Sequence, residues 1–551
     1  MKRLLALGAV AALLAGCATS PAREPALAPV PVPPPAPVPT PAPAPTVELQ
    51  VLAMNDFHGN LQPPQAFRLR NADGSETHIA VGGAEALASA ARQLRAAQAH
   101  HVFVAAGDLI GASPLLSALF DDVPTLESLS LMGLQLSAVG NHEFDKGAAE
   151  LLRRQNLPGM RFQYLAASTL DEKTGATLLP ASVVREFDGI PVGFIGLTLK
   201  GTPGLVMPTG VQGLRFDDEA ETINRETERL LARGVQAIVV LIHEGGYPSG
   251  GHDECPGISG PIVDIVQRSH KAVDAFVTGH THRAYNCRID GRLVTSGDKY
   301  GSMLTDIRLT LERRSGDVSA AQARNVLVRH DQFGKDAEQT ALLDRYLERA
   351  RAITERVVAR LETEIRVDVN DPAGASPMGQ LIADAQLEAT RPQGAEIAFM
   401  NSCGIRAGLP LGADRAIRYE HLFAAQPFGN QLITLSLSGA ELQQLLQRQF
   451  RDRRRCNQLQ VAHTLRYRWN GRYGAEARVS EVTVAGQPLQ PQRDYRVTVN
   501  NFIAVGGDGF EEFRRGRAPL SGPSDVQALE TYATRQGVLQ AAPLDRIRRV
   551  E

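Results

Sequence analysis

Between residues 46 and about 334, short β-rich apolar runs alternate with longer segments that have helical spacing. The runs are Val47–Met54, Val102–Ala106, Leu136–Val139, Val192–Leu197, Val235–Ile242 and Val273–Val277. One intervening segment, Gly83 to His100, has the apolar spacing of a helix. Strands that alternate with helices favour an α/β fold in packed layers. The runs Arg292–Ser296 and Met303–Leu311 are predicted to form a hairpin that closes this domain.

Residues that bind divalent metals follow these apolar runs at five places. They are Asp56, His58, Asp108, Asn141, His243, His280 and His282. Carboxylates, amide oxygens and imidazoles are ligands of first-row divalent metals, and α/β sheets place their sites outside the carboxyl ends of strands. A single His or Asp at a strand end is more often structural. Seven donors in five such positions predict a metal site.

The number of donors favours two divalent ions that act on phosphate esters. Uncatalysed hydrolysis of a phosphate monoester is extremely slow. Two ions about 3.5–4 Å apart lower the pKa of a shared water and hold the phosphoryl oxygens. Asp108 is the predicted bridge because a carboxylate has two oxygens, and Asn141 offers a neutral oxygen that limits the negative charge near the substrate. The donor set leaves zinc, manganese, iron, cobalt and magnesium open.

His142 is predicted to face the substrate. Neighbouring side chains diverge on a turning loop, so a residue next to Asn141 points elsewhere. Asp145, three residues further on, would hold the imidazole and raise its pKa. A protonated His142 would stabilise developing charge or protonate the leaving oxygen. The alternative is a purely structural His–Asp pair.

A second domain is predicted after a connecting helix. Residues Asp336 to about Thr363 have helical spacing without Gly or Pro, which predicts one long, mostly exposed helix. Beyond it, the predicted elements are a helix at Met378–Thr390, strands at Glu396–Met400, Gln431–Leu437 and Tyr495–Asn500, and a helix at Glu441–Phe450. Ser438 and Glu441 form the capping box of that last helix.

Three loops of the second domain carry candidate substrate contacts. Asn401, Gly404 and Arg406 follow a strand and would bind phosphate or sugar oxygens, although an ordinary surface turn is equally compatible. Phe428 and Phe502 stand beside turn-forming residues and could stack on a flat base, although a Phe more often belongs to the core. The formal net charge of −2 provides no basic excess for nucleic acid.

The amino terminus is typical of an exported protein. Lys2 and Arg3 precede an apolar segment from Leu4 to Leu14 that is too short to span a membrane comfortably. Residues 14–17 resemble the bacterial lipobox, in which Cys17 is lipidated, and Ala18 after it favours the outer membrane, facing the periplasm or the cell surface. An ordinary secretory signal is the alternative. Residues 18–45 are Pro-rich and predict a polyproline II spacer.

Four further cysteines, an even number, suit an oxidising compartment. Cys255 and Cys287 flank His280 and His282 and are predicted to pair, which would brace that loop. Cys403 with Cys456 would then follow by subtraction. Zinc binding by free thiols is an alternative that no Cys-x-x-Cys spacing supports.

The donor motifs, in this order, resemble the calcineurin-like metallophosphoesterase superfamily. Over residues 46–551, the two-domain arrangement resembles the 5′-nucleotidase family, which includes UDP-sugar hydrolases. The resemblance implies an αββα sandwich at 46–335, a connector helix at 336–363 and a smaller α/β substrate domain at 364–551. It implies one metal site of Asp56, His58, Asp108 and His282, and another of Asp108, Asn141, His243 and His280. It also makes His142 and Asp145 the catalytic dyad.

The same resemblance implies an exported 5′-nucleotidase that releases phosphate from nucleoside monophosphates. Phe428 and Phe502 would sandwich the base, Asp508 would bind the ribose, and Asn401, Arg406 and Asn430 would be polar contacts. The family usually has an Arg shortly before the helix that opens the second domain; here the nearest is Arg366, which leaves the phosphate grip open. The alternatives are a UDP-sugar, 2′,3′-cyclic nucleotide or sulfur-ester hydrolase, and a catalytically silent nucleotide-binding surface lipoprotein.

Overall fold

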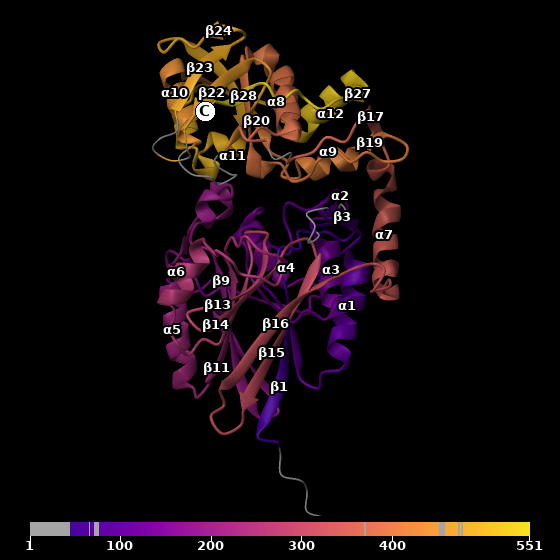
Figure 1. The fold of residues 1–551 in the computed structure, drawn as a ribbon, viewed down its shortest axis with the longest axis vertical. Coiled ribbons are helices and arrows are strands. Elements are labelled where there is room, and N and C mark those ends of the chain that lie inside the picture. The colour runs from indigo at the N-terminus through magenta and orange to yellow at the C-terminus, as the bar shows by residue number, and fades with distance from the viewer. Residues whose placement is uncertain are drawn as a thin grey trace, which may run out of the picture. The chain divides into compact units, whose positions relative to one another are not determined.

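The computed structural model describes residues 44–64, 67–70, 76–368, 371–450, 458–471, 474 and 478–550 (Figure 1). The signal-like segment with Cys17, the Pro-rich residues as far as 43, and Cys456 lie outside the described residues, so the export signal, the lipid anchor and the spacer stay predictions. Within the described part of the chain, none of the helices combines the length and apolar character needed to cross a bilayer.

Two six-stranded sheets form the centre of the first domain (Figure 1). The first has the order β16 (Val318–Leu327), β15 (Met303–Glu312), β1 (Thr46–Met54), β4 (His101–Ala105), β5 (Leu136–Ala138) and β6 (Gln163–Leu165). The second has the order β13 (Ala284–Ile289), β14 (Arg292–Gly297), β12 (Ala275–Thr278), β11 (Ala237–His243), β9 (Ile190–Thr198) and β8 (Ser182–Phe187). Strands β1, β4, β5 and β6 run parallel, as do β9, β11, β12 and β14.

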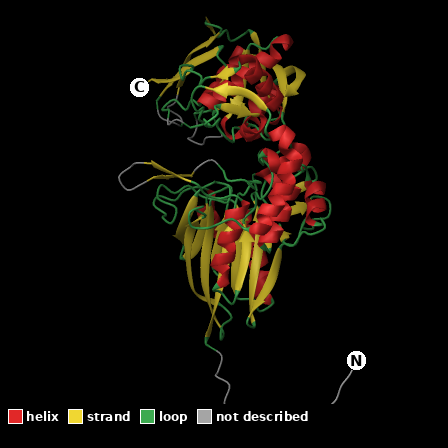
Figure 2. Cartoon of the chain, turned by 90° about the vertical axis from the view of Figure 1, so that its right-hand side faces the viewer, coloured by secondary structure: helices red, strands yellow, loops and turns green. Residues whose placement is uncertain are grey.

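The sheets pack face to face between two layers of helices, as Figures 1 and 2 show. Strand β1 illustrates this, because its alternate side chains point to opposite faces. Leu49 and Val51 pack against the second sheet, whereas Leu52 packs against α1 (Ala84–Ala96) and α3 (Val123–Met132). Helices α5 (Glu219–Ala232) and α6 (Pro261–Arg268) cover the outer face of the second sheet. The four layers are the αββα arrangement that the resemblance implied.

The predicted hairpin is wrong, because β14 and β15 belong to different sheets. Strand β14 pairs with β12 and β13, whereas β15 pairs with β1 from Thr46 to Ala53 and with β16. The two apolar runs are close together in the sequence, as the two strands of a hairpin would be. Each strand instead completes a different buried sheet, and residues 298–302 cross between the two sheets.

The second domain is an α/β unit whose two larger sheets, among the described residues, have five and four strands. The larger has the order β21 (Leu459–Val461), β18 (Ile397–Asn401), β25 (Asp494–Asn500), β20 (Gln431–Ser438) and β26 (Arg517–Ser524). The smaller contains β24 (Gln487–Pro488), β23 (Arg478–Val484), β22 (Leu465–Asn470) and β28 (Ile547–Val550). Helices α8 (Pro377–Thr390), α10 (Gly439–Arg448) and α12 (Asp525–Gln536) accompany them. The predicted capping box of α10 is confirmed, because Glu441 N donates to Ser438 Oγ and Ser438 N donates to Glu441 Oε2.

The connector is a helix followed by a strand, not one helix. Helix α7 (Ala337–Thr354) is capped by Asp336 and hydrogen-bonded to α3, where Ser128 Oγ donates to Gln339 Oε1 at 2.7 Å. The predicted helix is wrong beyond Thr354, because residues 357–361 form β17 (Val357–Leu361) between β19 (Ala416–Arg418) and β27 (Val538–Leu539). Two consecutive valines favour a strand there.

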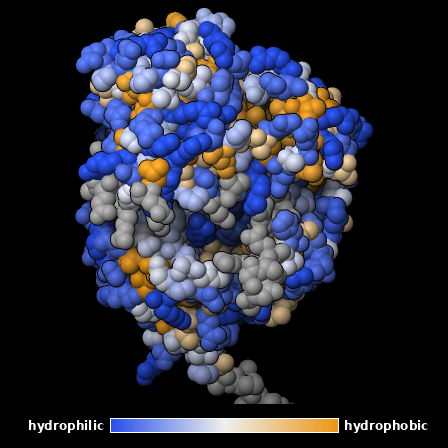
Figure 3. Space-filling model, turned by 45° about the horizontal axis from the view of Figure 1, so that its top comes forward, coloured by the Kyte–Doolittle hydropathy of each residue, from blue (hydrophilic) through white to orange (hydrophobic). Residues whose placement is uncertain are grey.

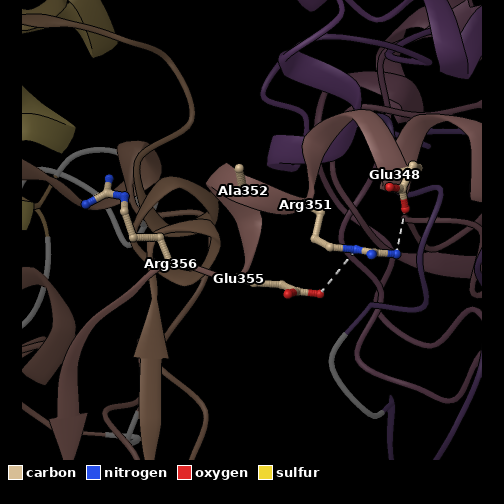
Figure 4. Close-up of a pocket in the computed structure, with 5 residues that line it drawn as sticks. All are labelled: Glu348, Arg351, Ala352, Glu355 and Arg356. Atoms are coloured by element: carbon tan, nitrogen blue, oxygen red, sulfur yellow. Dashed lines mark ion pairs between the residues drawn. The ribbon is translucent and has the colours of Figure 1, made fainter.

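A surface depression of about 580 Å³ marks this junction, lined by Glu348, Arg351, Ala352, Glu355 and Arg356 (Figure 4). Arg351 forms ion pairs with Glu348 and Glu355 along the last turns of α7 (Figure 4). The face of the molecule drawn in Figure 3 is mainly hydrophilic, with apolar residues in separate groups.

Candidate metal centre and substrate site

The seven predicted metal ligands gather at the carboxyl edges of the two central sheets. Asp56 and His58 follow β1, Asp108 follows β4, Asn141 follows β5, His243 ends β11, and His280 and His282 follow β12. The first five are at most 2% exposed, and the last two are half-buried. Parallel strands end at a common edge, so residues separated by more than 200 positions meet there.

Asp108 lies between two groups of donors. Its Oδ2 is 3.0 Å from His243 Nε2 and 3.6 Å from His58 Nε2. Asp108, His243 and His280 form one group whose ligand atoms lie within 4.8 Å of one another, and Asp56, His58 and His282 form another. Asn141 Oδ1 is 3.2 Å from His243 Nε2. Oxygen and imidazole donors in this arrangement fit divalent metal ions, with Asp108 where a bridging carboxylate is required.

Most of these ligands have an unusual backbone conformation. Five of the seven have positive φ angles, namely Asp56 (50°), His58 (46°), Asp108 (48°), His280 (67°) and His282 (53°). Non-glycine residues in this region cost on the order of 1–3 kcal/mol each, and they cluster at functional sites.

Glycines allow the ligand loops to approach one another. A Cβ on Gly140 would lie 2.1 Å from Asp108 Oδ1, and a Cβ on Gly107 would lie 2.6 Å from the amide nitrogen of Gly140. A side chain at either position would therefore separate the loops that carry Asp108 and Asn141.

Burial leaves three of the histidines neutral. It lowers the pKa of His58 and His282 well below the usual value, and it lowers the pKa of His280 to about 4. A neutral imidazole has the free lone pair that a metal requires.

His243 and Asp108 form a buried ion pair. Burial alone would lower the pKa of His243, but Asp108 and Asp56 outweigh it and raise the pKa to about 10. Burial would raise the pKa of Asp108, but His243 and His142 hold it well below its usual range. Metal binding at His243 would therefore release a proton.

Backbone carbonyls orient the metal-facing histidines. His243 Nδ1 donates to Ala106 O at 2.7 Å, and His58 Nδ1 donates to Gly111 O at 2.9 Å. Both contacts leave Nε2 free to face the cluster, which is how proteins usually fix a metal-binding tautomer.

Two supporting residues were not identified from the sequence. Glu143 is 1% exposed, and its carboxylate accepts from the backbone nitrogens of Asp108 (3.0 Å), Leu109 (2.8 Å) and Gly140 (2.6 Å), which ties the loops after β4 and β5 together. Burial raises its pKa to about 7. Asn55 Nδ2 donates to Asp56 Oδ2 at 2.7 Å. The available signal was their place in the sequence, since Asn55 directly precedes Asp56 and Glu143 follows Asn141 by two positions.

His142 and Asp145 form the predicted pair. His142 begins a short 3₁₀ segment (His142–Phe144) that ends at the C-cap Asp145, and its Nδ1 lies 2.9 Å from Asp145 Oδ2. His142 N donates to Asp108 Oδ1 at 2.9 Å. Burial lowers the pKa of His142, but Asp145 and Asp108 outweigh it and the net pKa is raised. The imidazole of His142 lies between the rings of His58 (5.1 Å) and Phe428 (5.7 Å between centroids).

Two predicted substrate residues reach the metal cluster from the second domain. Arg406 Nη2 lies 3.3 Å from His58 Nε2. The ring of Phe428 stacks on His142 with an interplanar angle of 24°, and the guanidinium of Arg406 lies 5.8 Å from the centre of that ring. These contacts join the two domains at the candidate site.

Other predicted contacts form a polar group around Asn401. Asn401 Nδ2 donates to Asp508 Oδ2 at 2.7 Å, and Asn401 Oδ1 accepts from Asn500 Nδ2 at 2.9 Å. Asn500 was not identified from the sequence. Burial raises the pKa of Asp508 to about 6, although the Asn401 hydrogen bond opposes it. Gly404 leaves room for the side chain of Asn401, because a Cβ on residue 404 would lie 2.8 Å from Asn401 Oδ1.

Phe502 and Asn430 lie against neighbours in their own domain. The half-buried ring of Phe502 packs on Gly507, where a Cβ would be 2.6 Å from the ring. The Asn430 carbonyl accepts from Asp525 N at 2.8 Å, and its side chain hydrogen-bonds the Asp525 carboxylate.

Cys255 and Cys287 form the predicted disulfide, with Cα atoms 5.2 Å apart. It joins the loop after His243 to strand β13, which follows His282, so it links two ligand loops. Cys403 is also disulfide-bonded, and its predicted partner Cys456 lies outside the described residues.

Both domains match known families. Residues 49–284 match the calcineurin-like phosphoesterase family, and residues 357–515 match the 5′-nucleotidase C-terminal domain. Endonuclease YhcR of Bacillus subtilis is 31% identical over 504 residues, which cover 88% of this chain but only 39% of that protein. The 5′-nucleotidase of Vibrio cholerae is 24% identical over 576 residues, covering 95% of this chain and 94% of that protein. The crystal structure of a 5′-nucleotidase precursor from Thermus thermophilus superposes with a TM-score of 0.77, 27% identity, and coverage of 91% of this chain and 99% of that one.

The matched regions contain the residues of the candidate site. The metal cluster falls in the first region, and Arg406, Phe428, Phe502 and Asp508 fall in the second. The chain therefore belongs to the 5′-nucleotidase family of calcineurin-like metallophosphoesterases, which are metal-dependent phosphoester hydrolases.

Proposed function

We propose that this protein is an exported two-metal 5′-nucleotidase that releases phosphate from nucleoside 5′-monophosphates for nucleotide scavenging. The observation that carries the proposal is the position of Asp108 between two donor groups, with Arg406 of the second domain in contact with the same cluster. A cluster that would hold two cations and that is approached by a guanidinium suits a phosphate dianion.

The donors divide into two sets that share Asp108. Asp56, His58, Asp108 and His282 would hold one ion, and Asp108, Asn141, His243 and His280 would hold the other. Once bound, the ions would supply an activated water and neutralise phosphoryl charge. Zinc, manganese, cobalt and magnesium all suit these donors, and the ions bound would follow availability.

His142 and Arg406 would act on the phosphate from the protein side. Asp145 holds His142 through Nδ1, so Nε2 is free to donate a proton to the leaving oxygen or to the developing charge. The guanidinium of Arg406 would orient phosphoryl oxygens through charge-assisted hydrogen bonds. This contact would supply a phosphate grip that does not depend on Arg366, the basic residue nearest the position of the usual family Arg.

The second domain would bind the nucleoside. Phe428 and Phe502 would stack on the base, and Asp508, with Asn401 and Asn430, would bind the ribose. Asn401 already orients the Asp508 carboxylate, which supports this assignment.

Replacing Phe428 by Ala is expected to raise the KM for AMP by about 10-fold, because base stacking contributes roughly 1–3 kcal/mol. Steady-state phosphate release measures it. Phe428 also stacks on His142, so ribose 5-phosphate, which has no base, is the control substrate. An equal loss on both substrates would contradict the stacking role.

Export is supported by the Cys255–Cys287 disulfide, because structural disulfides persist in oxidising compartments. We further propose that Cys17 is lipidated and anchors the protein to the outer membrane. Mass spectrometry of the mature protein from its membrane fraction tests both, because an unmodified mature chain that lacks residue 17 would refute the anchor.

A phosphate-release panel tests the proposed activity. The purified protein, loaded with Mn²⁺, Zn²⁺ or Co²⁺, is expected to release phosphate from AMP and UMP and to lose this activity in a chelator. UDP-glucose, 2′,3′-cyclic AMP, a thiosulfate ester and a short oligonucleotide are the alternative substrates, the last because one relative carries the name endonuclease. No turnover of any nucleotide, with nucleotide binding intact, would identify a silent binding protein.

A further inference from the structure

Three consecutive side chains after β5 point to three different places. Asn141 faces the metal donors, with its Oδ1 3.2 Å from His243 Nε2. His142 faces the second domain, where its ring stacks on Phe428. Glu143 is 1% exposed and points into the first domain. One short turn therefore carries a candidate metal ligand, a candidate acid and a buried carboxylate to which the proposed reaction gives no step.

The two carboxylate oxygens of Glu143 hold two separate segments. Oε2 accepts from Asp108 N at 3.0 Å and from Gly140 N at 2.6 Å. Oε1 accepts from Leu109 N at 2.8 Å and, more weakly, from the hydroxyl of the buried Tyr164 at 3.4 Å. Glu143 thus joins the segment that carries the predicted bridging ligand to the segment that leads into Asn141.

Asp108 needs such a support because its backbone is unusual. Its φ angle is 48°, and a non-glycine residue keeps this conformation only when its surroundings impose it. The two segments also lie unusually close together, since a Cβ on Gly140 would be 2.1 Å from Asp108 Oδ1 and 2.8 Å from Glu143 Oε2. The backbone amides that Glu143 accepts from are therefore the points at which the position of Asp108 is fixed.

Other ligands of the first donor set are held by different groups. The carboxylate of Asp56 accepts from Asn55 Nδ2 at 2.7 Å, and His58 Nδ1 donates to Gly111 O at 2.9 Å. These bonds are independent of Glu143. A loosened Glu143 would leave the first set with most of its donors in place.

The second donor set depends more heavily on Glu143. Of its four members, Asp108 and Asn141 both lie on the segments that Glu143 joins. Only His243 and His280 are delivered by the second sheet, on β11 and after β12. Loss of the Glu143 bonds would therefore displace half of this set.

We propose that Glu143 is a positioning residue that holds Asp108 and Asn141 at the spacing required by the second metal ion, and so controls whether that ion is bound. This rests on the proposed function for the presence of two ions. Residues that orient metal ligands through hydrogen bonds typically change metal affinity by about 10- to 100-fold when they are replaced.

The test is Glu143→Gln, which keeps the shape of the side chain. A glutamine amide has one accepting oxygen and a nitrogen that only donates, so it can serve Asp108 N and Gly140 N, or Leu109 N, but not both groups. The affinity for the second Mn²⁺ ion is expected to fall by about 10- to 100-fold, and that for the first to stay. Calorimetric titration of the chelator-stripped protein with Mn²⁺ measures both affinities, and anomalous scattering from Mn²⁺-loaded crystals shows which donors keep the ion.

Two further readouts separate positioning from a general loss of structure. Phosphate release from AMP by Glu143→Gln is expected to recover as Mn²⁺ is raised, which a misfolded variant would not do. In the metal-free variant, amide hydrogen exchange is expected to accelerate at residues 107–110 and 140. The matched control is Glu441→Gln, which also removes a carboxylate that accepts a backbone N–H, from Ser438 in the second domain. It is expected to lower thermal stability and to leave both Mn²⁺ affinities unchanged.

Glu143→Asp is the second variant, because it keeps the charge but shortens the reach by one methylene group. It is also expected to lose the second ion selectively. A wild type that binds two ions, with folded variants that bind both as tightly or lose both equally, would overturn the role of Glu143 and leave the nucleotidase proposal standing. A wild type that binds fewer than two ions would refute the two-metal proposal itself, and the role of Glu143 with it.

Discussion

Asp108→Asn is expected to reduce phosphate release from AMP by at least about 10³-fold, since metal-ion stabilisation of the reaction amounts to several kcal/mol. Asp108 approaches both donor groups, with Oδ2 at 3.0 Å from His243 Nε2 and 3.6 Å from His58 Nε2. An amide has the same shape but lacks the negative charge that two neighbouring cations require. Phosphate release and elemental analysis of bound metal are the measurements.

The matched control is Asp264→Asn, an exposed aspartate of α6 that pairs with Arg268. It is expected to retain full activity and metal content. Circular dichroism would show that Asp108→Asn is folded, and nucleotide binding would be reduced less than turnover. A folded Asp108→Asn protein that hydrolyses AMP at the wild-type rate would refute the two-metal arrangement.

His142→Asn is expected to reduce kcat for AMP by about 10²- to 10⁴-fold, the range for loss of a general acid. The reason is its position, bonded through Nδ1 to Asp145 and stacked beside the proposed substrate site. If the pair only stabilises the loop, the variant would lose thermal stability and keep its kcat. Thermal unfolding measured beside kinetics separates the two roles.

The pH dependence of kcat tests whether His142 acts in its protonated form. The carboxylates of Asp145 and Asp108 raise the pKa of His142 against the effect of burial. The protonated form is the active acid, so kcat is expected to fall as pH rises through that pKa. Asp145→Asn removes one of the two carboxylates and should move the fall to lower pH, and His142→Asn should abolish it. An alkaline limb that is unchanged in both variants would contradict the assignment.

The candidate metal donors could be singled out from the sequence, and their convergence expected, because they follow a local rule. Each lies at the end of an apolar run that is itself a strand, as with Asp56 after β1 and His243 at the end of β11. Parallel strands share one carboxyl edge, so strand ends that are distant in sequence meet in space. The Ser438–Glu441 capping box is equally local, because both partners lie within one helical turn.

The wrong predictions concern interactions between distant segments. The helical pattern from Asp336 continues past Thr354, but β17 takes residues 357–361 because β19 and β27 offer it backbone partners. Likewise β14 and β15 have the spacing of a hairpin, yet each completes a different sheet. Secondary-structure propensity and apolar periodicity depend only on residues that are close in the sequence. Pairing and burial of a segment in a sheet can override both.

The supporting residues were missed for the same reason. Glu143 is an ordinary acidic residue in sequence, and it becomes a structural element only because Asp108 N, Leu109 N and Gly140 N converge on its carboxylate. Asn500 reaches the substrate site through Asn401, which is 99 residues away and orients Asp508.

By itself, the sequence determined the layered α/β class, and it singled out seven candidate donors and the order in which the strands deliver them, because side-chain chemistry and apolar periodicity are local properties. Only the tertiary structure decided that Asp108 stands between two groups and that Arg406 and Phe428 reach the cluster. Those relations depend on how sheets pack and loops cross, which is fixed by burial of surfaces contributed from the whole chain.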